Sequence, residues 1–329
     1  MRICVYGAGA IGGHIAARLA KGGAEVSVVA RGAQLAAIQA QGLRVLAPDG
    51  VLESQPRASA DPADLGRQDA VIVTVKAPSL SQVAAGITPL LGPDTPVAFV
   101  MNGIPWWYFD RLGGRLDGLR LPELDPGEAL RRAVGIPRTL GGVVYSAATV
   151  VEPGVVRVQA EDGRVVLGEP DGSMSPRLQA LAAAIAAGGM GGQAVPDIRQ
   201  AIWSKLLGNL MTGLLCVLSR SAMNEVLAIP AARDAAIRIG EEVKAVAAAY
   251  GHDLGGAIAP RVERSMRLPH RPSILQDLEL GRPMEVEALW RAPLRLAREV
   301  GVAVPTLELM VALASQAARA AGLWQPQEG

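Results

Sequence analysis

The chain has 329 residues, half of them apolar, and its 32 basic and 31 acidic residues leave a net charge of +1. This length suggests two domains of about 100–200 residues each. The balanced charge argues against a nucleic-acid-binding face, and we see no run of about 18 apolar residues that would predict a transmembrane helix. We therefore expect a cytoplasmic protein without nucleic-acid or membrane partners.

The first 105 residues or so alternate between predicted strands and helices. Short apolar or β-branched runs predict strands at 3–6, 26–30, 70–75 and 97–101, and helical patterns lie at 11–21, 33–41 and 81–91. The continuous run at 70–75 is typical of a strand buried on both faces of a parallel sheet. This alternation predicts an α/β N-terminal domain of the doubly wound, Rossmann-like class.

The chain changes character after residue 105. Residues 106–140 read as an insertion or long loop, in which Trp106 and Trp107 either cover a site or pack in a core. Residues 143–165 hold short β-rich runs, with turns expected at 152–154 and at Asp162-Gly163. A helix is predicted at 177–187 and a flexible break at 188–192.

From Asp197, a plausible helix N-cap, the pattern is helical to the end of the chain. The predicted helices cover residues 198–217, 220–227, 230–250, 257–267, 273–280, 283–300 and 305–320. We therefore place the domain boundary near Val195-Pro196, between a doubly wound α/β domain at 1–196 and an all-α domain at 197–329.

Cysteine and histidine give no sign of a metal site. Cys4 and Cys216 lie far apart in apolar stretches and are expected to be reduced core thiols. The three histidines, His14, His252 and His270, are isolated and lack the spacing of metal ligands.

A glycine-rich motif follows the first predicted strand and opens the first helix. It reads Gly7, Ala8, Gly9, Ala10, Ile11 and Gly12. In this context a G-x-G-x-x-G motif predicts a dinucleotide-binding turn: the first glycine makes the turn, the second admits a pyrophosphate, and the third lets helix and strand pack closely. A glycine turn without a ligand is the alternative.

The end of the second strand indicates which dinucleotide binds. An NAD enzyme carries Asp or Glu there to hold the ribose 2′-hydroxyl, but this chain carries Arg31. A guanidinium suits the 2′-phosphate of NADP. The predicted cofactor is therefore NADPH, and an exposed arginine that begins a helix is the alternative.

Polar residues at strand ends and on helices form four further candidate groups. Lys76 and Asn102 each follow a predicted strand, where ligands of doubly wound sheets lie. Lys205 and Asn209 are four residues apart and share one helix face. Ser273 reads as an N-cap, while Glu285 and Glu287 fall in the first turns of the next helix. Taken singly, each has an ordinary structural explanation.

Together these groups resemble the ketopantoate reductase family over essentially the whole chain. The resemblance rests on the glycine loop, a Lys and an Asn-Gly at strand ends, W-x-K-x-x-x-N on a helix, and S-x-x-x-D followed by a Glu. It implies NADPH-dependent reduction of 2-dehydropantoate to pantoate, a step of pantothenate and coenzyme A biosynthesis.

The resemblance also implies roles for single residues. Lys205 would donate the proton to the reduced carbonyl oxygen, and Glu285 would be a second catalytic group. Glu285 and Lys76 would also lie at the nicotinamide end of the cofactor site. Asn209 and Ser273 would bind substrate, Asn102 would contact both ligands, and Ala147 would line the cofactor site. Burial would lower the pKa of Lys205 and Glu285 would raise it, and the sequence does not decide which effect is larger.

One position departs from the family pattern. The family has a second substrate-binding Asn four residues after the first, but this chain has Gly213, and Thr212 is the nearest hydroxyl. A reductase of another small 2-oxo acid therefore stays open as an alternative. A non-catalytic NADPH-binding sensor is less well supported, because it would not need Lys205 and Glu285. The sequence allows a homodimer but does not fix the oligomeric state.

Overall fold

The computed structural model describes residues 1–159 and 163–326, so Asp162 of the expected turn lies outside the described residues. Contacts divide the chain into two units. The first combines Met1–Met101 with Pro105–Ile198, and the second combines Asn102–Ile104 with Arg199–Gly329. The second unit thus takes three residues from the N-terminal part of the chain, in addition to the C-terminal segment.

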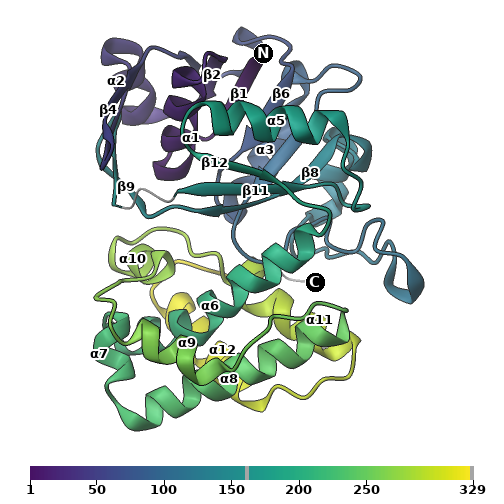
Figure 1. The fold of residues 1–329 in the computed structure, drawn as a ribbon, viewed down its shortest axis with the longest axis vertical. Coiled ribbons are helices and arrows are strands. Elements are labelled where there is room, and N and C mark those ends of the chain that lie inside the picture. Colours follow the sequence, from purple (N-terminus) through teal and green to yellow (C-terminus); the bar gives the residue numbers. More distant parts are fainter. Residues whose placement is uncertain (160–162, 327–329) are drawn as a thin grey trace. The chain divides into compact units, whose positions relative to one another are not determined.

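The first unit is built on an eight-stranded sheet with the order β12-β11-β8-β7-β6-β1-β2-β5 (Figure 1). Its strands are β1 (Arg2–Tyr6), β2 (Glu25–Val29), β5 (Arg57–Ser59), β6 (Ala70–Val73), β7 (Val97–Val100), β8 (Thr139–Tyr145), β11 (Arg164–Gly168) and β12 (Gly191–Ala194). From β5 to β8 all neighbours are parallel, and β11 joins β8 antiparallel. The predicted doubly wound α/β class is confirmed.

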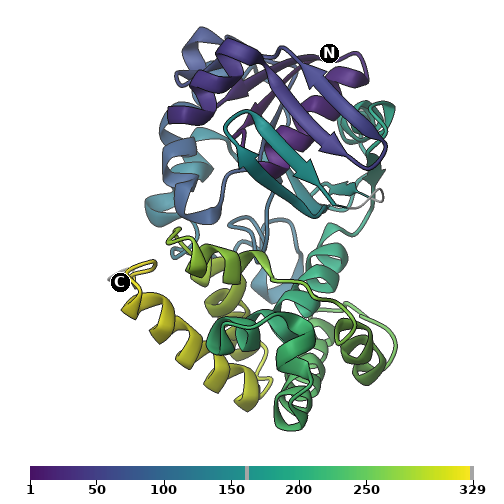
Figure 2. The same ribbon diagram turned by 90° about the vertical axis from the view of Figure 1, so that its left-hand side faces the viewer.

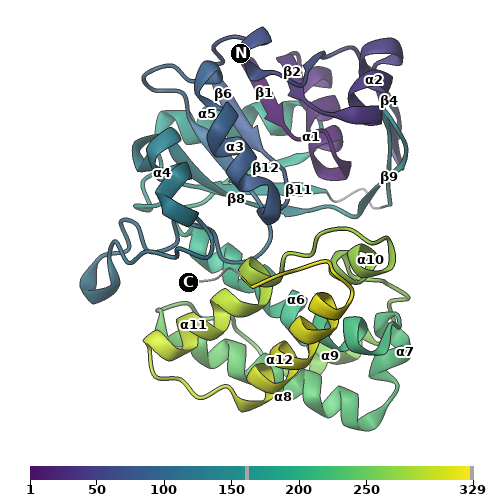
Figure 3. The ribbon, with the colours of Figure 1, turned by 180° about the vertical axis from the view of Figure 1, so that it is seen from behind.

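Helices cover both faces of this sheet. On one face lie α1 (Ala10–Lys21) and α5 (Pro176–Ala187), seen in Figure 1. On the other lie α3 (Leu80–Gly86) and α4 (Ala129–Ala133), seen in Figure 3. The side chains of Ile15 and Leu19 in α1 are fully buried, and that of Ile11 is partly buried. The helix predicted at 33–41 is confirmed as α2 (Gly32–Gln41), whereas α3 ends earlier than the helix predicted at 81–91.

A second, four-stranded sheet was not predicted. Its strands are β3 (Leu43–Ala47), β4 (Gly50–Ser54), β9 (Ala148–Glu152) and β10 (Val155–Val158), in the order β4-β3-β10-β9 (Figure 2). Helix α1 contacts all four of these strands. The expected turn at 152–154 joins β9 to β10.

The flexible break expected at 188–192 is wrong. Residues 191–194 form the edge strand β12, which pairs in parallel with β11. The glycines there serve close packing: a β-carbon on Gly192 would lie 2.0 Å from the carbonyl oxygen of Ala182 in α5, and one on Gly188 would lie 1.8 Å from that of Arg18 in α1. Any side chain would therefore force these elements apart.

The 106–140 segment is folded, and its tryptophans belong to the core of the first unit. Trp106 and Trp107 are 2% and 0% exposed. A β-carbon on Gly141 of β8 would lie only 2.4 Å from the Trp107 ring, so glycine there makes room for the indole. Of the two interpretations left open by the sequence, core packing is confirmed for both side chains.

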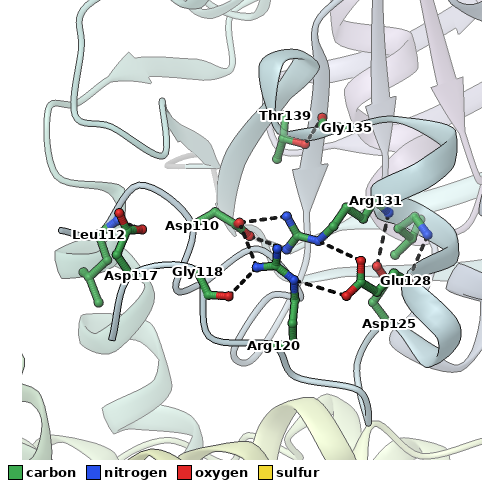
Figure 4. Close-up of polar contacts among 11 residues, drawn as sticks. Asp110, Leu112, Asp117, Gly118, Arg120, Asp125, Glu128, Arg131, Gly135 and Thr139 are labelled. Atoms are coloured by element: carbon green, nitrogen blue, oxygen red, sulfur yellow. Dashed lines mark hydrogen bonds and ion pairs between the residues drawn. The ribbon is translucent and has the colours of Figure 1, made fainter. Parts of the chain in front are cut away.

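An ion-pair cluster around Asp110 holds this segment together (Figure 4). Asp110 is buried and accepts two hydrogen bonds from Arg131, at 2.8 and 2.6 Å, while Arg120 adds a longer contact of 3.5 Å. Asp125 accepts hydrogen bonds from the backbone N–H groups of Leu130 and Arg131, at 2.8 and 3.1 Å. These carboxylates fix the segment through charge-assisted bonds, which are stronger than neutral ones.

Replacing Asp110 with alanine should lower the free energy of unfolding by about 3–5 kcal/mol, because Arg131 would keep a largely buried charge without its main partner. Urea denaturation measures this loss. The matched control is Asp117→Ala, which removes an exposed carboxylate that accepts one hydrogen bond of 3.2 Å from Leu112. Equal stability of the two variants would show that the Asp110 cluster does not stabilise the fold.

The second unit is all-α, as predicted. Its helices are α6 (Ile198–Ser219), α7 (Met223–Leu227), α8 (Pro230–Ala249), α9 (Ile258–Ser265), α10 (Ser273–Glu279), α11 (Ala292–Glu299) and α12 (Pro305–Ala320), with a π-helical turn at Glu287–Arg291 before α11. Among the described residues, α6 alone is long and apolar enough to cross a membrane. However, 67% of its most apolar window is buried inside the protein, as in a core helix.

Both cysteines are free and buried, as expected of core thiols. Burial raises the pKa of each to about 12. The thiols are therefore held in the protonated, unreactive form at neutral pH.

Candidate active site

The glycine loop joins β1 to α1 at the carboxyl end of β1. Gly7 has φ +108°, and a β-carbon there would lie 2.6 Å from a methyl group of Val75. A β-carbon on Gly12 would lie 1.9 Å from the carbonyl oxygen of Gly7. Gly7 and Gly12 are thus required by the conformation and packing of the loop itself.

Gly9 differs from these two glycines. It is exposed, and a β-carbon on it would meet no atom within 4 Å. It is the N-cap of α1, has no capping side chain, and is followed by a first turn without an acidic residue. The first N–H groups of the helix, from Ala10 and Ile11 onward, are thus open to an anion. This cradle fits a pyrophosphate that approaches the backbone closely.

Three side chains that the sequence analysis did not identify form hydrogen bonds with the glycine loop or with Arg31. The Thr74 hydroxyl donates to the carbonyl oxygen of Gly7 at 2.7 Å, and the Gln34 amide donates to that of Ala8 at 2.7 Å. Arg31 precedes α2 and is exposed, and its guanidinium donates to the side chain of Gln82 in α3. No local motif marks these contacts, because each partner lies at least 26 residues away.

Lys76 and Ala147 follow strands that run parallel to β1. Lys76 comes three residues after β6, before a short 3-10 turn, and Ala147 lies between β8 and β9. The carboxyl ends of β6 and β8 lie at the same edge of the sheet as the glycine loop. Both residues are therefore at the edge where doubly wound sheets bind ligands.

The Asn102–Ile104 segment follows β7 but packs within the second unit. Gly103 has φ +80°, and its β-carbon would lie 2.4 Å from the carbonyl oxygen of Ala288 in the π-helical turn. That carbonyl accepts a hydrogen bond of 2.9 Å from the N–H of Ile104. In π-helical register its donor would be residue 293, a proline without an N–H. The Asn-Gly pair thus docks onto a carbonyl that the helix leaves open.

Docking of this segment brings Asn102 to Glu285. The amide nitrogen of Asn102 donates to Glu285 Oε2 at 3.5 Å, and Glu285 is 5% exposed. Asn102 Oδ1 is buried and has no hydrogen-bond partner within residues 1–159 and 163–326. A buried polar atom of this kind is costly unless a ligand or water pairs with it, which fits a binding role.

Lys205 of α6 belongs to the same group. Burial lowers its pKa to about 8, while the negative charge of Glu285 acts in the opposite direction. Of the two effects left open by the sequence, burial is therefore the larger. An ammonium group with a pKa near 8 is charged at neutral pH, yet releases its proton more readily than an ordinary lysine.

The remaining expected substrate residues lie on α6 and α10. Asn209 is one turn after Lys205 and partly buried. Ser273 is exposed, but it is the first residue of α10 and not its N-cap, which is Pro272. The N-cap interpretation of Ser273 is therefore wrong, and its hydroxyl is not needed to cap the helix. Glu285 lies two residues before the π-helical turn, and Glu287 within that turn contacts Arg291 and Trp324.

Comparison with known proteins identifies the family. The family model described as ketopantoate reductase PanE/ApbA matches residues 3–172, and its C-terminal counterpart matches residues 197–318. A 2-dehydropantoate 2-reductase of Mesorhizobium japonicum is 42% identical over 320 residues, covering 95% of this chain and 96% of the relative. The chain belongs to the ketopantoate reductase family.

Solved structures agree with this assignment. A structure from Ralstonia solanacearum MolK2 has a TM-score of 0.91 at 39% identity and covers 98% of this chain and 99% of its own. The 2-dehydropantoate 2-reductase of Methylococcus capsulatus has a TM-score of 0.81 at 29% identity, with 98% of each chain covered. Membership of the ketopantoate reductase family makes this chain an oxidoreductase with the two-part fold described above.

No metal centre accompanies these residues. Within the described ranges, no three His, Cys, Asp or Glu side chains are grouped so that they could hold a metal ion.

Proposed function

We propose that this chain catalyses the NADPH-dependent reduction of 2-dehydropantoate to pantoate, a step of pantothenate biosynthesis. The observation that carries the proposal is the buried group of Lys205, Glu285 and Asn102, in which the lysine has a pKa of about 8. The relatives named 2-dehydropantoate 2-reductase support the substrate. The open cradle at Gly9 and the guanidinium of Arg31 support the cofactor.

In the proposed mechanism NADPH, when bound, supplies a hydride to C2 of the 2-oxo acid. Lys205 stabilises the negative charge that grows on the ketone oxygen and gives that oxygen a proton from its ammonium group. The C=O bond thereby becomes CH–OH, and Lys205 is left as a neutral amine that takes a new proton from solvent. Each turnover consumes one hydride and one proton.

The other residues of the second unit orient the reactants. Glu285 keeps Lys205 more readily charged than burial alone would, and it holds the amide of Asn102. Asn209 and Ser273 bind the substrate, and fixing the carbonyl in this way lowers the entropic cost of the reaction. In the first unit, Lys76 and Ala147 line the nicotinamide end of the cofactor site.

The proposed partners are small molecules, and the proposed location is the cytoplasm, where thiols such as Cys4 and Cys216 stay reduced. The test is oxidation of NADPH, followed by absorbance, with the purified protein and 2-dehydropantoate. We expect turnover with NADPH and little with NADH. NADPH binding without turnover of any 2-oxo acid would favour the non-catalytic sensor.

Replacing Arg31 with glutamate should reverse the cofactor preference. The new carboxylate would repel the 2′-phosphate of NADPH and accept a hydrogen bond from the 2′-hydroxyl of NADH. We expect the ratio of kcat/KM for NADPH over NADH to fall by about 100-fold or more, equivalent to about two charge-assisted hydrogen bonds. The control is Arg57→Glu, which changes an exposed arginine on β5. An unchanged ratio in the Arg31 variant would show that Arg31 does not contact the phosphate.

A further inference from the structure

His14 is a buried histidine of α1 that the proposed reaction does not use. It lies two residues after the glycine loop and is 2% exposed. Its Nδ1 lies 3.0 Å from the hydroxyl oxygen of Ser146, and the Nε of Arg18 donates to its Nε2 at 3.3 Å. A β-carbon on Gly163 would lie 3.2 Å from the His14 ring, so glycine there leaves room for the imidazole. His14 therefore joins α1 to the segment between β8 and β9.

Arg18 is held in one orientation by Asp49. Arg18 is 4% exposed, and its two terminal nitrogens donate to the two carboxylate oxygens of Asp49 at 2.7 Å each. A bidentate pair of this kind fixes the plane of the guanidinium. The hydrogen bonds from Arg18 lower the pKa of Asp49 to about 2, so the carboxylate is ionised at neutral pH. The remaining N–H of Arg18, on Nε, is directed at His14.

Arg18 decides which ring nitrogen of His14 carries the proton. A guanidinium only donates hydrogen bonds, so Nε2 of His14 must accept and is unprotonated. Burial, together with the charge of Arg18, lowers the pKa of His14 to about 4, so the ring is neutral at pH 7. A neutral imidazole has one N–H, which here must be on Nδ1. Nδ1 donates to Ser146, and the hydroxyl proton of Ser146 is therefore directed to a different acceptor.

Ser146 lies at the edge of the sheet where the cofactor is proposed to bind. It is partly buried and follows the carboxyl end of β8, directly before Ala147. The strand order reverses beside β1, which pairs with β2 on one side and β6 on the other. A dinucleotide lies across such a switch point. Because Arg31, the proposed partner of the adenosine 2′-phosphate, follows β2, the nicotinamide half belongs on the side of β6, β7 and β8, which carries Ser146.

We propose that the Ser146 hydroxyl donates a hydrogen bond to the carboxamide oxygen of the nicotinamide, and that His14 is a positioning residue that directs this hydroxyl. The proposal rests on the proposed use of NADPH and adds a specific contact to it. The carboxamide oxygen is the one strong acceptor on the nicotinamide ring. Holding it restricts rotation of the ring, so that one face is presented to the substrate.

The first experiment measures, by calorimetry, the Kd values of the wild type and of Ser146→Ala for three ligands. They are NADP⁺, thio-NADP⁺, in which sulfur replaces the carboxamide oxygen, and 2′-phospho-ADP-ribose, which lacks the nicotinamide. We expect the variant to bind NADP⁺ about 3–10-fold more weakly, the usual effect of one neutral hydrogen bond. The other two Kd values should stay within about twofold, because sulfur is a weak acceptor.

The control is Ser173→Ala, which changes an exposed serine between β11 and α5 and should leave all three Kd values unchanged. An equal loss of affinity for NADP⁺ and thio-NADP⁺ in Ser146→Ala would show that the hydroxyl does not contact the carboxamide oxygen. An unchanged Kd for NADP⁺ would also overturn the proposal.

NMR of the wild type tests the orientation of His14. The chain has three histidines, and in an assigned spectrum the ¹⁵N shifts of a neutral ring distinguish its protonated nitrogen from its unprotonated one. We expect the proton of His14 on Nδ1. A proton on Nε2 would make Nδ1 an acceptor from Ser146, which would leave the hydroxyl no proton for the cofactor and overturn the proposal.

A double-mutant cycle tests whether His14 acts through Ser146. His14→Leu should weaken NADP⁺ binding about threefold, since a hydroxyl that is no longer directed loses part of its hydrogen bond. Adding His14→Leu to Ser146→Ala should cause no further loss. If the two losses multiply, His14 does not act through this hydroxyl.

These binding data are independent of the proposed reaction. If no 2-oxo acid is turned over but Ser146→Ala selectively loses affinity for NADP⁺, the hydrogen bond is supported and the reaction is overturned. If 2-dehydropantoate is turned over and Ser146→Ala binds NADP⁺ as the wild type does, the reaction is supported and the hydrogen bond is overturned. A wild type that does not bind NADP⁺ would overturn both.

Discussion

Lys205→Ala should lower kcat by about 10²–10⁴-fold, the usual contribution of a positioned general acid. The Kd for NADPH should stay within about twofold, because the glycine loop and Arg31 belong to the first unit. Single-turnover kinetics and fluorescence titration measure the two quantities. The matched control is Lys244→Ala, which removes a partly exposed lysine of α8 that donates to the carbonyl oxygen of Gly256. Wild-type turnover by the Lys205 variant would remove this residue from the mechanism.

The dependence of kcat/KM on pH is a second test of the role of Lys205. A proton donor must be protonated in the free enzyme, and burial lowers the pKa of Lys205 to about 8. We therefore expect kcat/KM to be level below about pH 8 and to fall tenfold per pH unit above it. An ordinary lysine would keep the profile level to about pH 10. A level profile from pH 7 to 10 would contradict the role assigned to burial.

Glu285→Gln should shift the fall of kcat/KM, expected above about pH 8 in the wild type, to lower pH. Glu285 raises the pKa of Lys205 through its negative charge, so glutamine, which is uncharged but still accepts a hydrogen bond from Asn102, leaves burial unopposed. The measurement is kcat/KM as a function of pH. The control is Glu287→Gln, which loses the ion pair with Arg291 but can still accept the hydrogen bond from Trp324, and which should leave the fall in kcat/KM near pH 8.

Glu285→Ala removes the hydrogen-bond acceptor as well as the charge. Loss of a hydrogen bond to a charged group costs about 1.5–3 kcal/mol, so we expect kcat/KM at pH 7 to fall by about 10–150-fold. At pH values below this fall, the glutamine variant should have a higher kcat/KM than the alanine variant. Equal activity of the two variants at every pH would show that Asn102 does not depend on Glu285.

The sequence predicted the parallel sheet well because its signal is local. Val71 to Val73 are fully buried, and a strand covered on both faces must be apolar throughout. The second sheet lacks that signal: β4 is largely exposed, and β3 pairs with β10, more than 100 residues later in the chain. Strand pairing at such a distance, and glycines required by close packing as in β12, have no local signature.

The candidate site was predicted as a set of residues, but not as an arrangement. Spacing alone put Lys205 and Asn209 on one helix face. The contact between Asn102 and Glu285 depends on a segment that follows β7 yet packs with the second unit. The size of the burial effect on Lys205 likewise depends on neighbours that are distant in sequence.

Docking of the Asn102–Ile104 segment means that a single cut between residues 196 and 197 does not divide this chain into two complete halves. A C-terminal fragment would lack the N–H that pairs with the Ala288 carbonyl and the amide that pairs with Glu285. An N-terminal fragment would expose three residues whose partners are elsewhere. Gene fusions, split reporters and domain exchanges made with this chain therefore need two junctions in the N-terminal part as well as one near residue 198.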